Sequence, residues 1–378
     1  MSAVTHAVVI GLRPDGPSQV SRRSKDNYLG NYAHLATPSA EIATALSKLP
    51  PPDDTVDPDA LKAGFLVGIA ASNAMKRKLI TLPNDDELQV KEGKIPVEGG
   101  EIRVLTYVPS PRNSTEESFP LLVWFHGGGW TLGAPEMDDL ILRRVCVELK
   151  TSVVSVDYRK APEFPFPIPV NDCYEAMKWS IDNAFHLSAS PAQGLLIGGC
   201  SAGGNIAAAL ALRARDDPFF DKNEGKAVTG QFLQVPLVIH PEVVPAQYKS
   251  ELLSYEQNKD APILSVKNIY TVLNFYKPDP QSPLFSPLLA SSHKGLPPAY
   301  LQLCGQDPLR DEGFLYERVL NQSGVKTKFE VYPGYPHGGQ HVLLGLEITK
   351  KFDDDFVEGV RWLLQNRFDS ASTSAETE

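Results

Sequence analysis

The stretch "GGCSAGGN", Gly198 to Asn205, places four glycines at the junction of two different sequence patterns. The residues Gly194 to Gly199 form a short apolar run, which is typical of a strand buried on both faces. The residues Asn205 to Ala214 are predicted to form a helix. The stretch is therefore expected to be a sharp turn from a buried strand into a helix.

The residues Gly199 to Gly203 match the pattern G-x-S-x-G. A sharp strand-to-helix turn forces strained backbone angles on its central residue and leaves no room for flanking side chains, which explains the glycines. Because such a turn presents only its centre, Ser201 is predicted to be a nucleophile and Cys200 to pack under the turn. The alternative is a glycine-rich turn that contains an ordinary buried serine, since five-residue matches also occur by chance.

Similar apolar runs alternate with helical patterns along most of the chain. This alternation predicts an α/β fold with a mostly parallel sheet, helices on both faces, and a ligand site beyond the carboxyl ends of the strands. The run Ile102–Val108 partly alternates apolar and polar residues, as a half-buried antiparallel strand does. The other predicted strands are Pro120–Phe125, Ser152–Val156, Phe232–Ile239, Ala299–Cys304 and Lys328–Tyr332, and the other predicted helices are Ala60–Met75, Asp139–Leu149, Asp172–Phe185, Asp311–Gln322 and Thr349–Asn366.

Local signals indicate where some of these helices begin and end. Asn171 or Asp172 is predicted to cap the start of one helix, because a short polar side chain accepts a hydrogen bond from the first turn. Gly324 lies just past Gln322 and is predicted to stop the helix that ends there.

A serine hydroxyl needs a base, and the base needs a third group that orients it. His337, in "YPGYPHGGQ", directly follows the last predicted strand. It is therefore expected at the edge of the sheet where the sharp turn at Gly199–Gly203, the elbow, lies. The stretch "CGQDPLRDEG" supplies Asp307 at the mouth of the preceding strand, whereas Asp311 is expected to open the next helix as a cap. Asp307 is therefore favoured, and the order Ser201, Asp307, His337 is the order that this kind of sheet imposes on a triad.

The stretch "FHGGGW", Phe125 to Trp130, follows another predicted strand. A tetrahedral intermediate of acyl transfer develops a negative oxygen, which needs backbone N–H donors that no side chain obstructs. Three successive glycines supply such donors. A single glycine in this place could be explained by a loop that needs positive φ. Three successive glycines, followed along the chain by the elbow, Asp307 and His337, favour the oxyanion-binding loop.

These motifs together resemble the hormone-sensitive-lipase branch of the α/β-hydrolase fold, a group of carboxylesterases and lipases. The resemblance runs from about Leu121 to Gly338 and includes "HGGGW", "VDYRKAPEFPFPIPVNDC", "GCSAGGN", "SPLLA", "GQDPLRDEG" and "PHG". It implies catalytic roles for three residues: Ser201 as nucleophile, His337 as base and Asp307 as its orienting group. It further implies that the oxyanion is held by the N–H groups of Gly128, Gly129 and Ala202.

The resemblance also implies a helical cap over the site. The expected organisation is an N-terminal cap segment at residues 1–80 and a catalytic domain at 81–368 with a cap insertion at about 240–280. The small polar end of the chain, residues 369–378, is expected to be a disordered tail.

Two positions depart from the pattern of this branch. An acidic residue usually precedes the serine, whereas Cys200 stands here. The histidine is usually followed by glycine and an aromatic residue, whereas here Gly338 is followed by Gly339 and Gln340.

The stretch after the predicted strand Ser152–Val156 is expected to brace the loop of glycines. Tyr158, Arg159 and Glu163 are predicted to form a buried cluster, because buried ions are usually paired. His126 is likewise expected to support this loop rather than to transfer a proton.

Composition excludes several classes of protein. The chain carries 36 basic and 46 acidic residues, a net charge of −10, and its basic residues form no stripe, so nucleic-acid binding is not expected. No apolar run is long enough to span a membrane, and no signal peptide is recognised. A cytoplasmic protein with reduced thiols is predicted, since no C-x-x-C pair occurs among Cys146, Cys173, Cys200 and Cys304.

The leading functional hypothesis is hydrolysis of a small, apolar carboxylic ester through an acyl-enzyme, with no metal or organic cofactor. The second hypothesis keeps the site and changes the reaction to acyl transfer, dehydration or cyclisation in specialised metabolism. A ligand receptor without catalysis is the third. The protein is expected to be a monomer or homodimer, and several aromatic residues are assigned either to a substrate pocket or to the core: Trp130, Tyr255, Tyr270, Phe275 and Tyr276.

Overall fold

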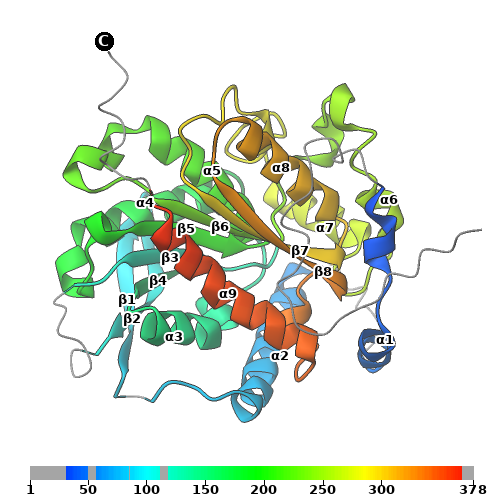
Figure 1. Cartoon of the computed structure of the whole chain (residues 1–378), viewed down its shortest axis with the longest axis horizontal. Helices are drawn as coiled ribbons and strands as arrows, with labels where there is room; N and C mark the ends of the chain where they lie inside the picture. The colour runs from blue at the N-terminus through cyan, green and yellow to red at the C-terminus, as the bar shows by residue number, and fades with distance from the viewer. Residues whose placement is uncertain (1–30, 50–56, 85, 111–117, 368–378) are drawn as a thin grey trace, which may run out of the picture. The chain divides into compact units, whose positions relative to one another are not determined.

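The computed structural model describes residues 31–49, 57–84, 86–110 and 118–367, which are built around an eight-stranded sheet (Figure 1). The strands lie in the order β1, β2, β4, β3, β5, β6, β7, β8. Their bounds are β1 Leu88–Val97, β2 Gly100–Pro109, β3 Leu121–Phe125, β4 Ser152–Asp157, β5 Leu195–Cys200, β6 Gly230–Gln234, β7 Ala299–Gln306 and β8 Thr327–Pro336. The α-helices are α1 Ala40–Leu46, α2 Pro58–Leu79, α3 Asp139–Glu148, α4 Ile168–Asp182, α5 Ala202–Asp216, α6 Ser254–Gln257, α7 Val266–Tyr276, α8 Arg310–Gln322 and α9 Glu347–Gln365.

The sheet is parallel from β4 to β8 and antiparallel at its other end. Strand β2 pairs antiparallel with both β1 and β4, whereas β4, β3, β5, β6, β7 and β8 run parallel. The antiparallel strand expected near residues 102–108 is confirmed. The predicted α/β architecture is confirmed with it, and all parallel strands end at one edge.

Apolar side chains cover both faces of the sheet. Along β3, Leu121, Val123 and Phe125 belong to one hydrophobic cluster with α4, α5 and α8. The alternate residues Leu122 and Trp124 belong to a second cluster with α3 and α9, and α9 crosses the sheet in Figure 1. Because both faces are buried, β3 is a continuous apolar run without polar alternation.

The predicted end of β6 is wrong. The strand was expected to continue to Ile239, but it ends at Gln234. The next residue, Val235, has a φ of 42°, and Pro236 has no N–H to donate to a neighbouring strand. The apolar residues that follow are buried outside the sheet, so hydrophobicity alone overextended the strand.

The predicted cap of α4 is also wrong. The helix begins at Ile168, after Pro167, so that Asp172 lies inside it and Asn171 does not cap it. The carboxylate of Asp172 instead accepts hydrogen bonds from the backbone N–H and the guanidinium of Arg159. A tertiary partner therefore engages the side chain that looked like a cap. The stop at Gly324 is confirmed, with a φ of 83° just beyond α8.

Part of the first 80 residues packs against the carboxyl edge of the sheet. A short 3₁₀ helix, Tyr32–Ala36, approaches β7 so closely that a Cβ at Gly305 would lie 2.0 Å from the carbonyl oxygen of Leu35. Helix α2, of which no residue is buried, was expected over Ala60–Met75 and is longer at both ends. The expected tail at 369–378 lies outside the described residues.

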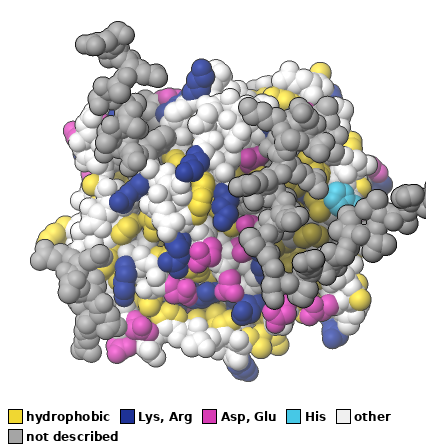
Figure 2. All heavy atoms as spheres, in the orientation of Figure 1, with side chains coloured by type: hydrophobic (Ala, Val, Ile, Leu, Met, Phe, Trp, Pro, Cys, Tyr) yellow, Lys and Arg dark blue, Asp and Glu magenta, His cyan; other side chains and the backbone are white. Residues whose placement is uncertain are grey.

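The surface mixes both signs of charge. On the face drawn in Figure 2, acidic and basic side chains lie next to one another. Along α9, Lys350 pairs with Asp354 and Lys351 with Asp355. Within the ranges that the structure describes, no helix is long and apolar enough to cross a membrane. The four cysteines are all free and buried.

Candidate active site

The turn at Ser201 joins β5 to α5 and has a strained backbone. Ser201 has φ 56° and ψ −114°, and its N–H donates to the carbonyl oxygen of Gln234 at 2.7 Å. A Cβ at Gly203 would lie 1.9 Å from the carbonyl oxygen of Phe125, and one at Gly199 would lie 2.4 Å from the backbone of Gly203. The glycines are therefore required by close backbone approach, and the strain at the central residue is held in place by packing.

Ser201, His337 and Asp307 form a hydrogen-bonded line. The distance from Ser201 Oγ to His337 Nε2 is 2.9 Å, and the distance from His337 Nδ1 to Asp307 Oδ2 is 2.8 Å. The histidine and the aspartate are 7% and 1% exposed, so little water competes for these bonds. The three residues singled out from the sequence are thus brought within reach of one another.

Asp307 and Asp311 have different partners. The second oxygen of Asp307 accepts the N–H of Leu309 at 2.9 Å, which fixes the carboxylate toward His337. Asp311 was expected to cap α8, and this prediction is wrong. The residue lies in the first turn of the helix and accepts the N–H groups of Leu253 and Ser254. The other oxygen of Asp311 accepts the Nε–H of the neighbouring Arg310 at 2.8 Å. The chain positions of Leu253 and Ser254 did not predict their contact with Asp311.

The loop after β3 approaches the elbow with two glycines in the left-handed region. Gly128 has a φ of 115° and Gly129 a φ of 60°. A Cβ at Gly128 would lie 2.4 Å from the carbonyl oxygen of Leu132, and one at Gly129 would lie 2.8 Å from Val272 of α7. Helix α7 therefore packs directly on the glycine loop.

His126 and Tyr158 support the same loop. The Tyr158 hydroxyl donates to the carbonyl oxygen of His126 at 2.9 Å, and the two rings stack at 4.3 Å. His126 Nδ1 donates to the carbonyl oxygen of Gly127 at 2.7 Å. Burial lowers the pKa of His126 to about 3, so the ring is neutral at pH 7 and braces the loop.

In place of the predicted cluster, Tyr158, Arg159 and Glu163 each have a partner outside it. Arg159 pairs with Asp172 at 2.6 Å, whereas Glu163 is half exposed and pairs with Lys62 of α2. The prediction for Glu163 is wrong, because its partner comes from a helix a hundred residues earlier in the chain.

Cys200 is buried beneath the elbow. The residue is 1% exposed, and Gln340 Nε2 lies 3.7 Å from its Sγ. Burial, with a further contribution from Asp138, raises the pKa of the thiol well above its ordinary range. The thiolate, not the thiol, is the nucleophilic form of cysteine, so a buried thiol that stays protonated favours Ser201 over Cys200 as the nucleophile.

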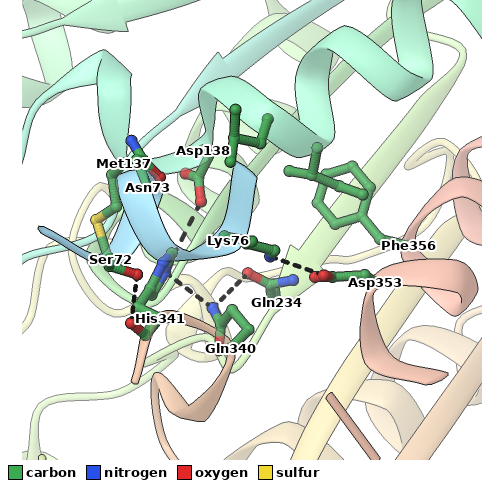
Figure 3. A pocket seen from close by; sticks show the side chains of 12 residues that line it. Ser72, Asn73, Lys76, Met137, Asp138, Gln234, Gln340, His341, Asp353 and Phe356 are labelled. Atoms are coloured by element: carbon green, nitrogen blue, oxygen red, sulfur yellow. Dashed lines mark hydrogen bonds and ion pairs between the residues drawn. The ribbon is translucent and has the colours of Figure 1, made fainter. Parts of the chain in front are cut away.

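A polar cavity of about 20 Å³ lies under α2, behind the elbow (Figure 3). Burial raises the pKa of Asp138 to about 6, against the opposing hydrogen bond from Trp124. Burial, with Lys76 nearby, lowers the pKa of His341 to about 3. No local sequence pattern predicted the group of residues that lines this cavity, because they come from distant parts of the chain, among them α2, the loop before α3 and the loop that follows His337 (the histidine loop).

Two further features bear on chemistry. Glu312, in the stretch "DEG", is 1% exposed and accepts the N–H groups of Val238 and Ile239, where the insertion begins. The sequence analysis did not single out Glu312, although three acidic residues in "GQDPLRDEG" were a signal.

Among the described residues, no group of three or more histidines, cysteines or carboxylates is arranged to hold a metal ion.

Five aromatic residues were assigned from the sequence either to the core or to a substrate pocket, and two of them belong to the core. Trp130 stacks on Tyr276 with ring centroids 4.7 Å apart, and both are at most 2% exposed. Tyr270 is 39% exposed, while Tyr255 and Phe275 are half-buried.

The elbow, the glycine loop and the hydrogen-bonded line lie together at the carboxyl edge of a mostly parallel sheet. This arrangement defines the α/β-hydrolase class of protein.

Comparison with known proteins agrees with this class. The model of the α/β hydrolase fold family matches residues 122–341. The chain is 33% identical to a versiconal hemiacetal acetate esterase of Dothistroma septosporum over 81% of this chain and 89% of that one. It is similar to the crystal structure of a vibralactone cyclase, with a TM-score of 0.83 and 40% identity over 88% of this chain and 96% of that one. An esterase of Pyrobaculum calidifontis matches with a TM-score of 0.72 and 30% identity over 86% and 99%.

The chain therefore belongs to the α/β-hydrolase family, in its hormone-sensitive-lipase-like carboxylesterase branch. It is an esterase- and lipase-like hydrolase.

Proposed function

We propose that the protein hydrolyses small carboxylic esters through an acyl-enzyme, with Ser201 as nucleophile, His337 as base and Asp307 as the group that orients the base. The observation that carries the proposal is the continuous line of hydrogen bonds from Ser201 Oγ to Asp307 Oδ2. Esterases among the relatives support it.

The chemistry follows from this line. The Oγ of Ser201 attacks the ester carbonyl as His337 Nε2 takes its proton, and the same nitrogen returns the proton to the leaving alcohol. Asp307 holds Nδ1–H and stabilises the charged ring. We assign the N–H groups of Gly128, Gly129 and Ala202 to the negative oxygen of the tetrahedral intermediate. Water then cleaves the acyl-enzyme by the same route.

Replacing Ser201 by alanine tests the proposal. Hydrolysis of p-nitrophenyl acetate by Ser201→Ala is expected to fall by about 10⁴-fold or more, because the members of a triad act as a unit. Ser180→Ala is the matched control, since this buried serine of α4 only donates to the carbonyl oxygen of Ala176.

A fluorophosphonate adduct located by fragment-ion mass spectrometry is expected on Ser201 and not on Cys200. Undiminished turnover by Ser201→Ala, or an adduct on the cysteine, would contradict the assignment. Binding of esters with no turnover by the wild-type protein would instead favour a receptor.

We further propose that α2 and the insertion at about 240–280 form a cap that selects an apolar substrate. Val272 of α7 packs on Gly129, which supports a cap in contact with the site. From α2, Ser72 donates to the carbonyl oxygen of His341, and Asn73 to that of Glu136. These contacts link α2 to the histidine loop and to the loop before α3.

The second candidate is an intramolecular acyl transfer that closes a lactone. It is favoured by the similarity to a vibralactone cyclase, together with the unusual residues Cys200 and Gln340. The two reactions differ in mass balance, since hydrolysis adds water to the substrate and cyclisation of a hydroxy ester expels the alcohol. Mass spectrometry of products formed in H₂¹⁸O distinguishes them, because only hydrolysis incorporates ¹⁸O into the acid.

We also propose a cytoplasmic location and a monomeric or homodimeric state. Four free, buried thiols support the first proposal, because reducing compartments keep thiols unpaired. Light scattering of the purified full chain tests the second.

A further inference from the structure

We infer that Gln340 is a positioning residue that ties the loop of His337 to the nucleophile elbow. Gln340 lies three residues after His337 in the chain and is 4% exposed. The inference rests on the proposed function, because it concerns how the base is held against the nucleophile.

The side-chain amide of Gln340 reaches the elbow from the histidine loop. Its Nε2 donates to Gln234 Oε1 at 3.3 Å (Figure 3). The same nitrogen lies 3.7 Å from Cys200 Sγ. It also lies 3.1 Å from Nε2 of His341. Cys200 directly precedes Ser201, and the carbonyl oxygen of Gln234 accepts the N–H of Ser201 at 2.7 Å. One side chain therefore contacts both residues that hold the nucleophile's backbone.

The shape of the histidine loop directs Gln340 inward. Gly338 has a φ of 71°, and a Cβ at Gly339 would lie 2.8 Å from the ring of Tyr335. Two successive glycines thus let the chain turn tightly over Tyr335 and point the next side chain under the elbow. The loop is fixed to β8 at one end and to the elbow by Gln340.

Gln234, the partner of Gln340, is itself held by neighbouring strands. Gln234 Nε2 donates to Gln302 Oε1 at 2.7 Å, and Gln302 Nε2 donates to the hydroxyl of Tyr332 at 2.7 Å. These residues lie on β6, β7 and β8. Because the side-chain amides of Gln234 and Gln302 have partners for both their oxygen and their nitrogen atoms, Gln340 donates to a fixed support and not to a mobile side chain. The Oε1 of Gln340 itself has no hydrogen-bond partner among the described residues.

The two departures from the pattern of the branch, Cys200 before the serine and Gly339-Gln340 after the histidine loop's first glycine, are joined by the contact of Gln340 with Cys200. An acidic residue at position 200 would bring a second carboxyl close to Asp138, which already contributes to the raised pKa of the thiol. The neutral sulfur of Cys200 accepts a neighbouring amide without that repulsion. The aromatic residue usual in this branch would fall at position 339, where a Cβ would lie 2.8 Å from the ring of Tyr335. Glycine at this position leaves room for the turn that brings Gln340 under the elbow.

The test compares two buried glutamines in the purified full chain. Gln340→Met keeps the length of the side chain and removes the amide, so kcat for p-nitrophenyl acetate is expected to fall about tenfold with KM unchanged, since misplacing a base slows the reaction step. Gln231→Met is the matched control, because this residue lies at the other end of β6 and its amide donates to the carbonyl oxygen of Pro297. It is expected to lower the unfolding temperature and leave kcat unchanged.

The reciprocal variant Gln234→Met breaks the same link from the elbow side. It is expected to lower kcat and the rate of fluorophosphonate labelling of Ser201, and it tests the link if Gln340→Met does not fold. Equal kcat values for the wild type and a folded Gln340→Met or Gln234→Met overturn the inference, and so does an effect on KM alone. In that case the proposed function stands, whereas a wild-type protein without ester turnover removes both.

Discussion

At the scale of the residue, burial decides which ionisable groups carry charge. Glu312 is enclosed at the base of the insertion, and burial raises its pKa to about 8, against the opposing hydrogen bonds from the N–H groups of Val238 and Ile239. The carboxyl is therefore protonated in the folded protein at pH 7 and ionised in the unfolded chain. Below pH 4.5 both states hold the proton, and above that the folded state holds more.

This difference predicts how stability depends on pH. Because the folded state holds this proton more tightly, the free energy of unfolding falls as the pH rises from about 4.5 to 8. The fall that is due to Glu312 is at most about 1.4 kcal/mol per pH unit. Glu312→Gln removes this slope and keeps an oxygen for both N–H groups, so the variant is expected to gain stability relative to wild type as pH rises. Urea unfolding at pH 5, 6, 7 and 8 measures it. Parallel curves would contradict the assignment, and Glu163→Gln, at an exposed site, is the control.

At the scale of the element, the elbow is determined by backbone contacts. Gly203 lies in the first turn of α5 where the helix touches the end of β3, so no side chain fits. Gly68 of α2 has no atom within 4 Å of an added Cβ. The same substitution is therefore expected to have opposite effects in the two helices.

Gly203→Ala places a methyl group 1.9 Å from the carbonyl oxygen of Phe125, so the elbow must move and the folded, active protein is expected to be lost. Gly68→Ala is expected to stabilise the protein by up to about 1 kcal/mol, because alanine has the higher helix propensity. Thermal unfolding and ester turnover of both variants measure this. A folded, fully active Gly203→Ala would show that the turn is looser than the contacts indicate.

At the scale of the whole molecule, α2 is attached by polar contacts. No residue of α2 is buried, yet Lys76 pairs with Asp353 of α9 at 2.7 Å and both side chains are about nine-tenths covered (Figure 3). Lys62 pairs with Glu163 at the other end of the helix, where the side chains are 22% and 51% exposed. The attachment is therefore expected to depend mainly on the inner pair.

Lys76→Ala leaves Asp353 without its partner in a buried site, and is expected to destabilise the protein by about 1 to 3 kcal/mol. It is also expected to make α2 more sensitive to limited proteolysis. Lys62→Ala is the control, because an exposed pair contributes about 0 to 1 kcal/mol. Equal digestion rates for the two variants would place the attachment elsewhere.

From the chain by itself, the sheet, the sharp turn at Ser201 and the positions of Asp307 and His337 near that turn could be predicted. Apolar runs predict buried strands, and the order of Ser201, Asp307 and His337 follows from strand order, because parallel strands end at one edge. Helix caps were predicted less well. Asp172 and Asp311 carry the local signal of a cap, but their carboxylates bind groups brought near only by folding.

Only the tertiary structure decided which distant side chains meet. The contact of Gln340 with Cys200 spans 140 positions, and that of Lys76 with Asp353 joins α2 to α9. A local pattern records the period of a helix or the space at a turn, and this was enough to place Ser201 at the centre of the elbow. It contains no record of partners that are distant in the chain, so the residues supporting the elbow from below became visible only in the folded protein.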